Sequence, residues 1–219
     1  MDIDFLARKI AADEVVNADI FKTIADIPYP ADGVIFDSNN LEVAEIIKNE
    51  KYSGIRIKLT GILGKIKQRT QIDIGFGDVV FPKPVEMEYP TLLKMENPII
   101  YAYSVESLIA EKFEAMIDLS EANSRMKDFY DVFNILEKGN FNFNHLAKAI
   151  ERTFAKRKTT LVKSHPLFSK SFANDEFRNK QWQAFLRKVN LDTSLEFSKV
   201  MAKISSGLQP IYDEMFESK

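Results

Sequence analysis

YSVESLIAEKFEAMIDLSEANSRMKDFYDVFNIL, residues 103–136, is the stretch that decides the fold. It predicts two amphipathic helices joined by a polar turn. In the first helix, apolar residues recur at three- and four-residue steps, as they do on the core-facing side of a helix: Val105, Leu108, Ile109, Phe113, Met116 and Ile117. The second helix carries the same pattern at Phe129, Val132, Phe133 and Leu136. Ser104, directly before the first helix, is the predicted N-cap.

Packing does not require the charged residues of these two helices, which are Glu111, Lys112, Arg125, Lys127, Asp128 and Asp131. Asp128 and Asp131 are three residues apart and therefore share a helix face, and Arg125 lies one turn before Asp128. The spacing alone leaves two interpretations open: a solvated helix surface or a functional site. If the charges form a site, we expect Lys112 to lie beside Asp128 or Asp131.

The composition of the chain limits its class. Its 219 residues are 45% hydrophobic and 28% charged, with a net charge of −2, which suits a soluble globular protein of one or two domains. Cysteine is absent, which excludes disulfides and thiolate metal sites and agrees with a cytoplasmic location. No apolar run approaches the roughly 20 residues that span a bilayer, and the acidic start does not resemble a secretory leader, so no membrane partner is expected. The near-neutral charge restricts any nucleic-acid-binding surface to a local patch.

Two stretches in the first third of the chain predict strands with acidic side chains. Residues 2–5, DIDF, read as an extended segment that points Asp2 and Asp4 to the same side. Paired carboxylates are the hard oxygen ligands that Mg²⁺ prefers, although two Asp residues here could also be simply solvated. Residues 53–78 alternate around the turn GKIKQ and predict an antiparallel hairpin with Asp73, and Lys58 or Arg56, on its polar face. Asp73 would then be a third metal ligand or a solvent-facing residue of an edge strand.

The remaining segments predict a mainly helical second half. A short strand is expected at residues 34–36, a helical or extended piece at 41–50, and an extended connection at 81–90. Helices are expected at 143–157, 175–189, 194–206 and 210–216, with Asn142 or Asn144 capping the first and Asn174 the second. Because strands precede helices, the order favours an α+β arrangement. The basic run 156–165 and the cations Lys180, Arg187 and Lys188 are either RNA-phosphate contacts or solvated surface.

The segments SVESLIAEKFEAM and RMKDFYDVFNIL resemble the signature of the AbiEii/AbiGii family, the nucleotidyltransferase-like toxins of type IV toxin–antitoxin systems. In that family a Ser-x-Glu…Ala-Glu-Lys helix precedes an Arg-x-Lys-Asp-x-x-Asp helix. DIDF at residues 2–5 and QIDIGFGD at residues 71–78 match in the same order, so the resemblance covers about residues 2–137.

The resemblance implies an α+β fold: a nucleotidyltransferase-like antiparallel or mixed sheet with helices over residues 1–100, then a helical C-terminal region over 101–219 that carries the second half of the active site. The implied reaction is nucleotide transfer from an NTP to an RNA acceptor, in several members the 3′ end of tRNA. The implied cofactor is Mg²⁺, and its ligands are Asp2, Asp4 and Asp73. The implied catalytic residues are Asp73, Lys112, Asp128 and Asp131. The implied contacts of the nucleotide phosphates are Lys58, Lys112 and Arg125, and a cognate antitoxin is the implied protein partner.

The sequence departs from the family pattern at its start. Family members carry a Gly-Gly-Thr or Gly-Ser loop upstream of the paired Asp residues, where backbone N–H groups and a helix N-terminus hold phosphates. Here the pair begins at residue 2, so the resemblance implies a chain without this loop and without the first strand. We therefore expect weak or absent transfer, and a sheet edge that invites self-association. The alternative function is a catalytically inactive paralogue that binds RNA or an antitoxin.

Overall fold

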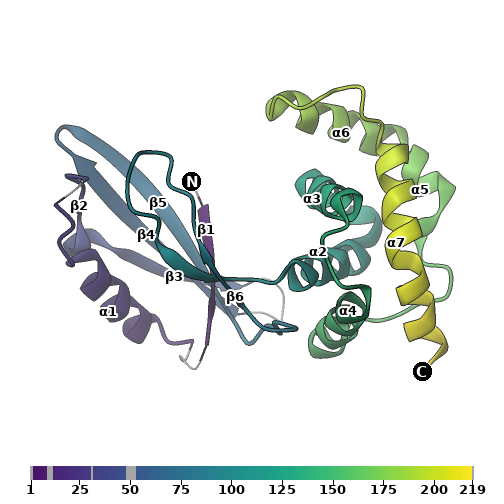
Figure 1. Cartoon of the computed structure of the whole chain (residues 1–219), viewed down its shortest axis with the longest axis horizontal. Helices are drawn as coiled ribbons and strands as arrows, with labels where there is room; N and C mark the ends of the chain where they lie inside the picture. Colours follow the sequence, from purple (N-terminus) through teal and green to yellow (C-terminus); the bar gives the residue numbers. More distant parts are fainter. Residues whose placement is uncertain (1, 9–11, 31, 48–52, 219) are drawn as a thin grey trace. The chain divides into compact units, whose positions relative to one another are not determined.

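The computed structural model describes residues 2–8, 12–30, 32–47 and 53–218, without the side chains of residues 2, 47 and 53. The chain forms two compact units, Met1–Asp78 and Val79–Lys219. The first is a sheet with one helix and the second is mainly helical, so the predicted α+β class is confirmed (Figure 1). The segment 79–100 belongs to the second unit.

The first unit is a mixed five-stranded sheet. It consists of β1 (Asp2–Ala7), β2 (Ile35–Phe36), β3 (Glu42–Ile47), β4 (Ser53–Leu63) and β5 (Ile66–Phe76). β5 lies between β1, which is parallel to it, and β4, which is antiparallel to it, while β2 and β3 both pair with β4. The predicted hairpin is thus confirmed, but its turn is shorter than GKIKQ. Leu63 pairs with Ile66, and Gly64 adopts a φ of 59° that suits a two-residue hairpin turn.

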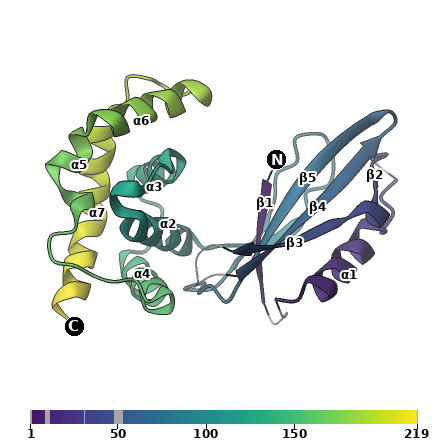
Figure 2. The same cartoon turned by 180° about the vertical axis from the view of Figure 1, so that it is seen from behind.

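The alternation of β4 and β5 gives this sheet one apolar and one polar face. The apolar face buries Ile55, Ile57, Ile72 and Ile74. Phe21 of α1 (Glu14–Ala25) packs against this cluster, and Figure 2 shows α1 lying along the sheet. Asp13 caps the start of α1: its carboxylate accepts a hydrogen bond from the N–H of Val16. Helix α1 thus covers the apolar face of the sheet (Figure 2). The opposite, polar face carries the acidic residues that the sequence predicts as a metal site.

The second unit opens with a hairpin that the sequence did not predict. β6 (Val85–Glu88) and β7 (Ile99–Ala102) form a two-stranded antiparallel sheet. The helices that follow are α2 (Val105–Leu119), α3 (Met126–Lys138), α4 (Phe143–Arg157), α5 (Lys170–Asn174), α6 (Glu176–Lys188) and α7 (Phe197–Glu217). The described residues also form 3-10 turns at Ser38–Asn40 in the first unit, and at Ser120–Ala122 and Pro166–Phe168 in the second.

The two helices predicted from residues 103–136 are confirmed as α2 and α3. Ser104 caps α2 by accepting a hydrogen bond from the N–H of Ser107. Helix α2 packs against α4, and α3 packs against α7. Phe113, Phe129 and Trp182 have no exposed surface in the core that results. Trp182 also satisfies its indole N–H with the carbonyl of Leu195 at 2.7 Å.

Three predictions for the later helices need correction or refinement. Helix α4 spans the predicted residues and is capped by Asn142. Helix α6 is capped by Asp175 instead of Asn174, because the Asp175 carboxylate reaches the N–H of Arg178. The prediction of two helices at 194–206 and 210–216 is wrong: α7 continues through Pro210. Its buried stripe runs on across the proline, so packing outweighs the lost backbone hydrogen bond.

Within the described residues, no helix combines the length and apolarity that crossing a membrane requires.

Candidate functional site

The register of the sheet brings the predicted acidic residues of the first unit together. Asp4 of β1 pairs with Asp73 of β5, and Arg56 of β4 pairs with Asp73 from the other side. Register partners on neighbouring strands point to the same face, and strands lie about 4.8 Å apart. Asp4, Arg56 and Asp73 therefore share the polar face. The strand that carries Asp73 thus lies beside the strand of Asp4, while the side chain of Asp2 lies outside the described residues.

Asp73 is held by a two-pronged ion pair. Its Oδ1 accepts from Nε of Arg56 at 2.8 Å, and its Oδ2 accepts from Nη2 of Arg56 at 2.8 Å. The Asp73 side chain is only 15% exposed, so this guanidinium compensates a carboxylate that is largely removed from water. The sequence offered Lys58 or Arg56 for this face, and only the register shows that Arg56 faces Asp73 directly. Lys58, the predicted phosphate contact, pairs with Gln71, two residues from Arg56 along the same face.

The carboxylates of the polar face supply some, but not all, of the oxygen ligands that a divalent ion needs. Mg²⁺ is commonly held in nucleotide enzymes by one or two carboxylates together with substrate phosphates and water. Asp4 and Asp73, on adjacent strands, supply such a pair. Among the described side chains, no group of three or more His, Cys, Asp or Glu residues is arranged to hold a metal ion. An ion at this face would share Asp73 with Arg56 or replace it.

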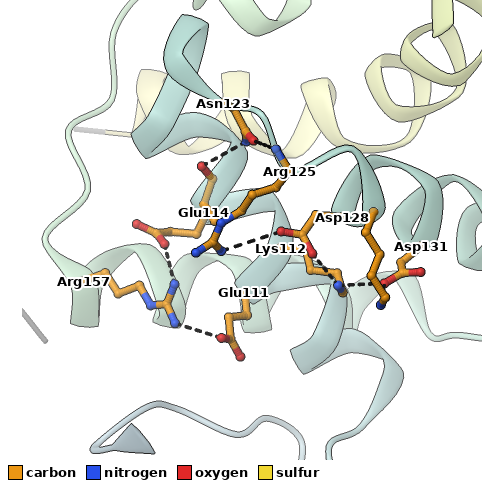
Figure 3. Close-up of polar contacts among 10 residues, drawn as sticks. Glu111, Lys112, Glu114, Asn123, Arg125, Asp128, Asp131 and Arg157 are labelled. Carbon is orange, nitrogen blue, oxygen red and sulfur yellow. Dashed lines mark hydrogen bonds and ion pairs between the residues drawn. The ribbon is translucent and has the colours of Figure 1, made fainter. Parts of the chain in front are cut away.

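The second predicted set surrounds Lys112 in the helical unit (Figure 3). Nζ of Lys112 on α2 donates to Oδ1 of Asp128 at 2.6 Å and to Oδ2 of Asp131 at 2.9 Å, both on α3. The expectation that Lys112 lies beside these residues is confirmed. Lys127 also donates to Asp131, at 2.7 Å. Lys112 is only 14% exposed, so its ammonium group bridges two helices from a largely buried position.

Burial and ion pairing shift the pKa values of Lys112 and Asp131 in opposite directions, and the combined effect of the ion pairs is the stronger one. Burial lowers the pKa of Lys112, but its hydrogen bonds to Asp128 and Asp131 raise it above the ordinary value. Burial likewise raises the pKa of Asp131, yet the hydrogen bonds from Lys127 and Lys112 bring it below the ordinary value. The ammonium group and the Asp131 carboxylate therefore stay charged at neutral pH.

This ion pairing predicts a loss of stability in acid. Because the folded-state pKa of Asp131 lies below the ordinary 3.8, its stabilisation is present above that pH and disappears as the pH falls through the lowered value. The contribution of Lys112 is present below its ordinary pKa of 10.5 and is lost only as the pH rises through the raised value. Urea unfolding at about pH 7 and about pH 3 should show a smaller acid-induced loss for Asp131→Asn than for the native sequence. The exposed Asp118→Asn is the control. Equal losses for Asp131→Asn and the native sequence would contradict the assignment.

Arg125 lies beside this cluster and keeps part of its surface in water. Its backbone N–H donates to Oδ1 of Asn123 at 2.8 Å, which fixes the start of α3. Its Nη1 lies 3.7 Å from Oδ2 of Asp128, and half of its side chain is exposed. A guanidinium so placed can bind an additional anion as a two-pronged donor.

A neighbouring buried network was missed by the sequence. Arg157, at the end of α4, contacts Glu114 at 2.7 Å and Glu111 at 3.3 Å. Thr159 also donates to Glu114 at 2.5 Å. These contacts tie α2 to the end of α4, and Figure 3 shows Arg157 pointing to both carboxylates. The partners are more than 40 residues apart along the chain, so no local spacing could have predicted them.

The candidate residues thus form two sets. Asp4, Arg56 and Asp73 belong to the first unit. The second set, here named the Lys112 cluster, consists of Lys112, Lys127, Asp128 and Asp131 and belongs to the second unit. That the helical region carries the second half of one active site stays a prediction.

A match to a family model agrees with the resemblance of the sequence to this family. A family model described as "Nucleotidyl transferase AbiEii toxin, Type IV TA system" matches residues 1–203. No curated protein matches the chain. The solved structure of JHP933 from Helicobacter pylori is similar at 13% identity and a TM-score of 0.47, covering 99% of this chain and 77% of that chain. A candidate nucleotidyltransferase from H. pylori is similar at 14% identity and a TM-score of 0.45, covering 100% of this chain and 80% of that chain.

Proposed function

Because the chain belongs to the family of AbiEii nucleotidyl transferase toxins of type IV toxin–antitoxin systems, we propose that it transfers a nucleotide from an NTP to an RNA acceptor, in the first instance the 3′ end of tRNA. The observation that carries this proposal is the pairing of Asp4 with Asp73 on one face of two parallel strands. This placement would supply two carboxylates to a metal-dependent transfer. The type IV assignment also implies a cognate antitoxin as a partner.

In the proposed reaction, the 3′-hydroxyl oxygen of the acceptor forms a bond to the α-phosphorus of the NTP. The bond from that phosphorus to the bridging oxygen breaks, and pyrophosphate leaves with the electron pair. Mg²⁺, when bound, would stabilise the charge that develops on the phosphate oxygens. Asp4 and Asp73 would hold it, with Asp2 as the third predicted ligand. The hydroxyl proton passes to water or to a carboxylate of the site.

The second set of residues would bind the phosphates and orient them. Lys112 supplies a compact positive charge and Arg125 a planar two-pronged donor, while Lys58 on the sheet face is a further candidate. Asp128, predicted as general base or orienting group, is best supported as the orienting group. Its 2.6 Å bond fixes the ammonium group of Lys112. Asp131 assists at 2.9 Å, as a weaker candidate for the same role.

Transfer can be tested with each radiolabelled NTP, total tRNA and Mg²⁺. We expect label to enter RNA at a low rate and the signal to disappear when the divalent ions are chelated. No transfer with any NTP, together with a lack of Mg²⁺-dependent NTP binding in calorimetry, would reject the proposal.

That result would favour the alternative, a non-catalytic protein that binds RNA or an antitoxin. One observation supports this alternative: the guanidinium of Arg56 compensates the charge of Asp73 through two hydrogen bonds of 2.8 Å. RNA binding that persists without Mg²⁺, in the absence of NTP binding, would establish it.

Lys112→Met should lower transfer about a hundredfold, as expected when one charged donor to a reacting phosphate is lost. The fold should survive because Asp131 keeps its bond to Lys127 and Asp128 keeps Arg125 nearby. The initial rate of label incorporation measures the effect, and circular dichroism checks the fold. Lys138→Met, at an exposed position on the same α3, is the control. Equal rates for the two variants would remove Lys112 from the proposed site.

A further inference from the structure

A pocket of about 590 Å³ lies where the start of α3 faces α6 in the helical unit. From the α3 side it is lined by Arg125, Lys127 and Asp128, and from α6 by Gln181, Phe185 and Lys188. A volume of this size is within the range of small-molecule binding pockets. The proposed function assigns Arg125 to phosphate binding and Asp128 to the orientation of Lys112, but it gives no role to the α6 side of the pocket.

The charges on the wall favour an anion. Three side chains are cationic, and the one carboxylate, that of Asp128, is already bonded to Lys112. Arg125 and Lys127 are 50% and 73% exposed, so their charged groups remain accessible. The first turn of α3 adds the partial positive charge of a helix N-terminus.

Two uncharged lining residues, Phe185 and Gln181, indicate that the anion is a nucleotide. Phe185 of α6 is only partly buried, and its ring packs against Tyr130 and Trp182 from the core side. An aromatic ring fixed in this way offers a surface for base stacking. The amide of Gln181 can both donate and accept hydrogen bonds. Cations, a ring and an amide together suit a nucleotide better than an isolated inorganic anion.

We propose that this α3–α6 pocket binds a phosphate group, with its nucleotide, of the acceptor RNA strand. The inference rests on the proposed function, because transfer to RNA is what brings such a strand beside Lys112 and Arg125. The pocket is open to solvent, which suits a chain that must enter and leave it. Arg125 lines the pocket and also lies 3.7 Å from Asp128, so it joins the pocket to the Lys112 cluster. The same chemistry could also accept the phosphates of the NTP.

Lys188 gives the sharpest test because it lies in the pocket without contributing to the Lys112 cluster. Of the three cations Lys180, Arg187 and Lys188, only Lys188 lines the pocket. Lys188→Glu should weaken binding of a fluorescent single-stranded RNA about tenfold and reduce the salt dependence of binding by about one phosphate contact. Lys180→Glu makes the same charge change at an exposed position of the same helix. It should leave the RNA affinity within about twofold of the native value.

Calorimetry with ATP and Mg²⁺ separates the two sources of phosphate. RNA affinity lowered in Lys188→Glu with ATP affinity unchanged supports the RNA strand as the occupant. Lowered ATP affinity with unchanged RNA affinity would overturn that assignment and place the NTP there. Equal RNA affinities for Lys188→Glu and Lys180→Glu, or no RNA binding by the native protein, would overturn the proposal. Both measurements detect binding alone. Failure of nucleotide transfer can therefore be distinguished from failure of the pocket assignment.

Discussion

Replacing Asp73 by Asn is expected to reduce nucleotide transfer at least about a thousandfold, to the background of the assay. A metal site that stabilises developing phosphate charge contributes several kcal/mol, and each 1.4 kcal/mol corresponds to a tenfold change in rate. Asn keeps the size of the side chain but removes the negative charge that lies between Asp4 and Arg56. Label incorporation from the preferred NTP measures the loss.

The matched control for this variant is Asp19→Asn. Asp19 is an exposed residue of α1, in the same unit. This variant should transfer label at the native rate. The loss in Asp73→Asn should also coincide with weaker Mg²⁺-dependent NTP binding, because the ion and the triphosphate share the site. Native transfer by Asp73→Asn would contradict the assignment of the sheet face as the catalytic centre. Equal loss of transfer in both variants would show that the loss is not specific to the Asp73 carboxylate and would contradict its assignment.

Replacing Phe113 by Ala is expected to lower the free energy of unfolding of the helical unit by about 3–5 kcal/mol. Phe113 is fully buried, and its ring lies 5.6 Å from that of Phe154 and 6.2 Å from that of Phe168. The smaller side chain would leave a cavity at the centre of the largest core. Trp182 is the single tryptophan of the sequence and is buried in the same core, so its fluorescence follows the unfolding of this unit in urea.

Phe177→Ala is the control for the core substitution. Phe177 lies on α6 and is 68% exposed, so its removal should change the free energy of unfolding by less than about 0.5 kcal/mol. Equal losses in the two variants would show that burial of Phe113 does not determine the stability of the unit.

The sequence by itself determined the elements whose signals are local. The apolar repeat of residues 103–136 predicts α2 and α3, because helix faces repeat every three to four residues. The alternation in residues 53–78 predicts the β4–β5 hairpin for the corresponding reason, since a strand face repeats every two residues. The side chain of Ser104 caps α2 from within the same turn, so its role could also be read locally. Asp128 and Asp131 could be placed on one face of α3 by spacing alone.

Only the tertiary structure decided how these elements meet. The parallel pairing of β1 with β5 joins residues about 70 positions apart, and strand order and register depend on which faces can be buried together. That pairing places Asp4 beside Asp73. The register between β4 and β5 places Arg56 on the other side of Asp73. Lys112 was predicted to meet Asp128 or Asp131. That it bonds to both depends on how α2 packs against α3.

The wrong prediction at Pro210 and the missed contacts of Arg157 in the second unit also depend on long-range packing. Pro210 predicts a break when only its neighbours are considered, because proline removes a backbone hydrogen bond. The buried stripe of α7 nevertheless includes Leu208 before it and Ile211 after it, and packing of this stripe into the core keeps the helix continuous. The contact of Arg157 with Glu114 likewise depends on the packing of α4 against α2. Local periodicity determined the elements, and long-range packing determined which of their charged side chains meet.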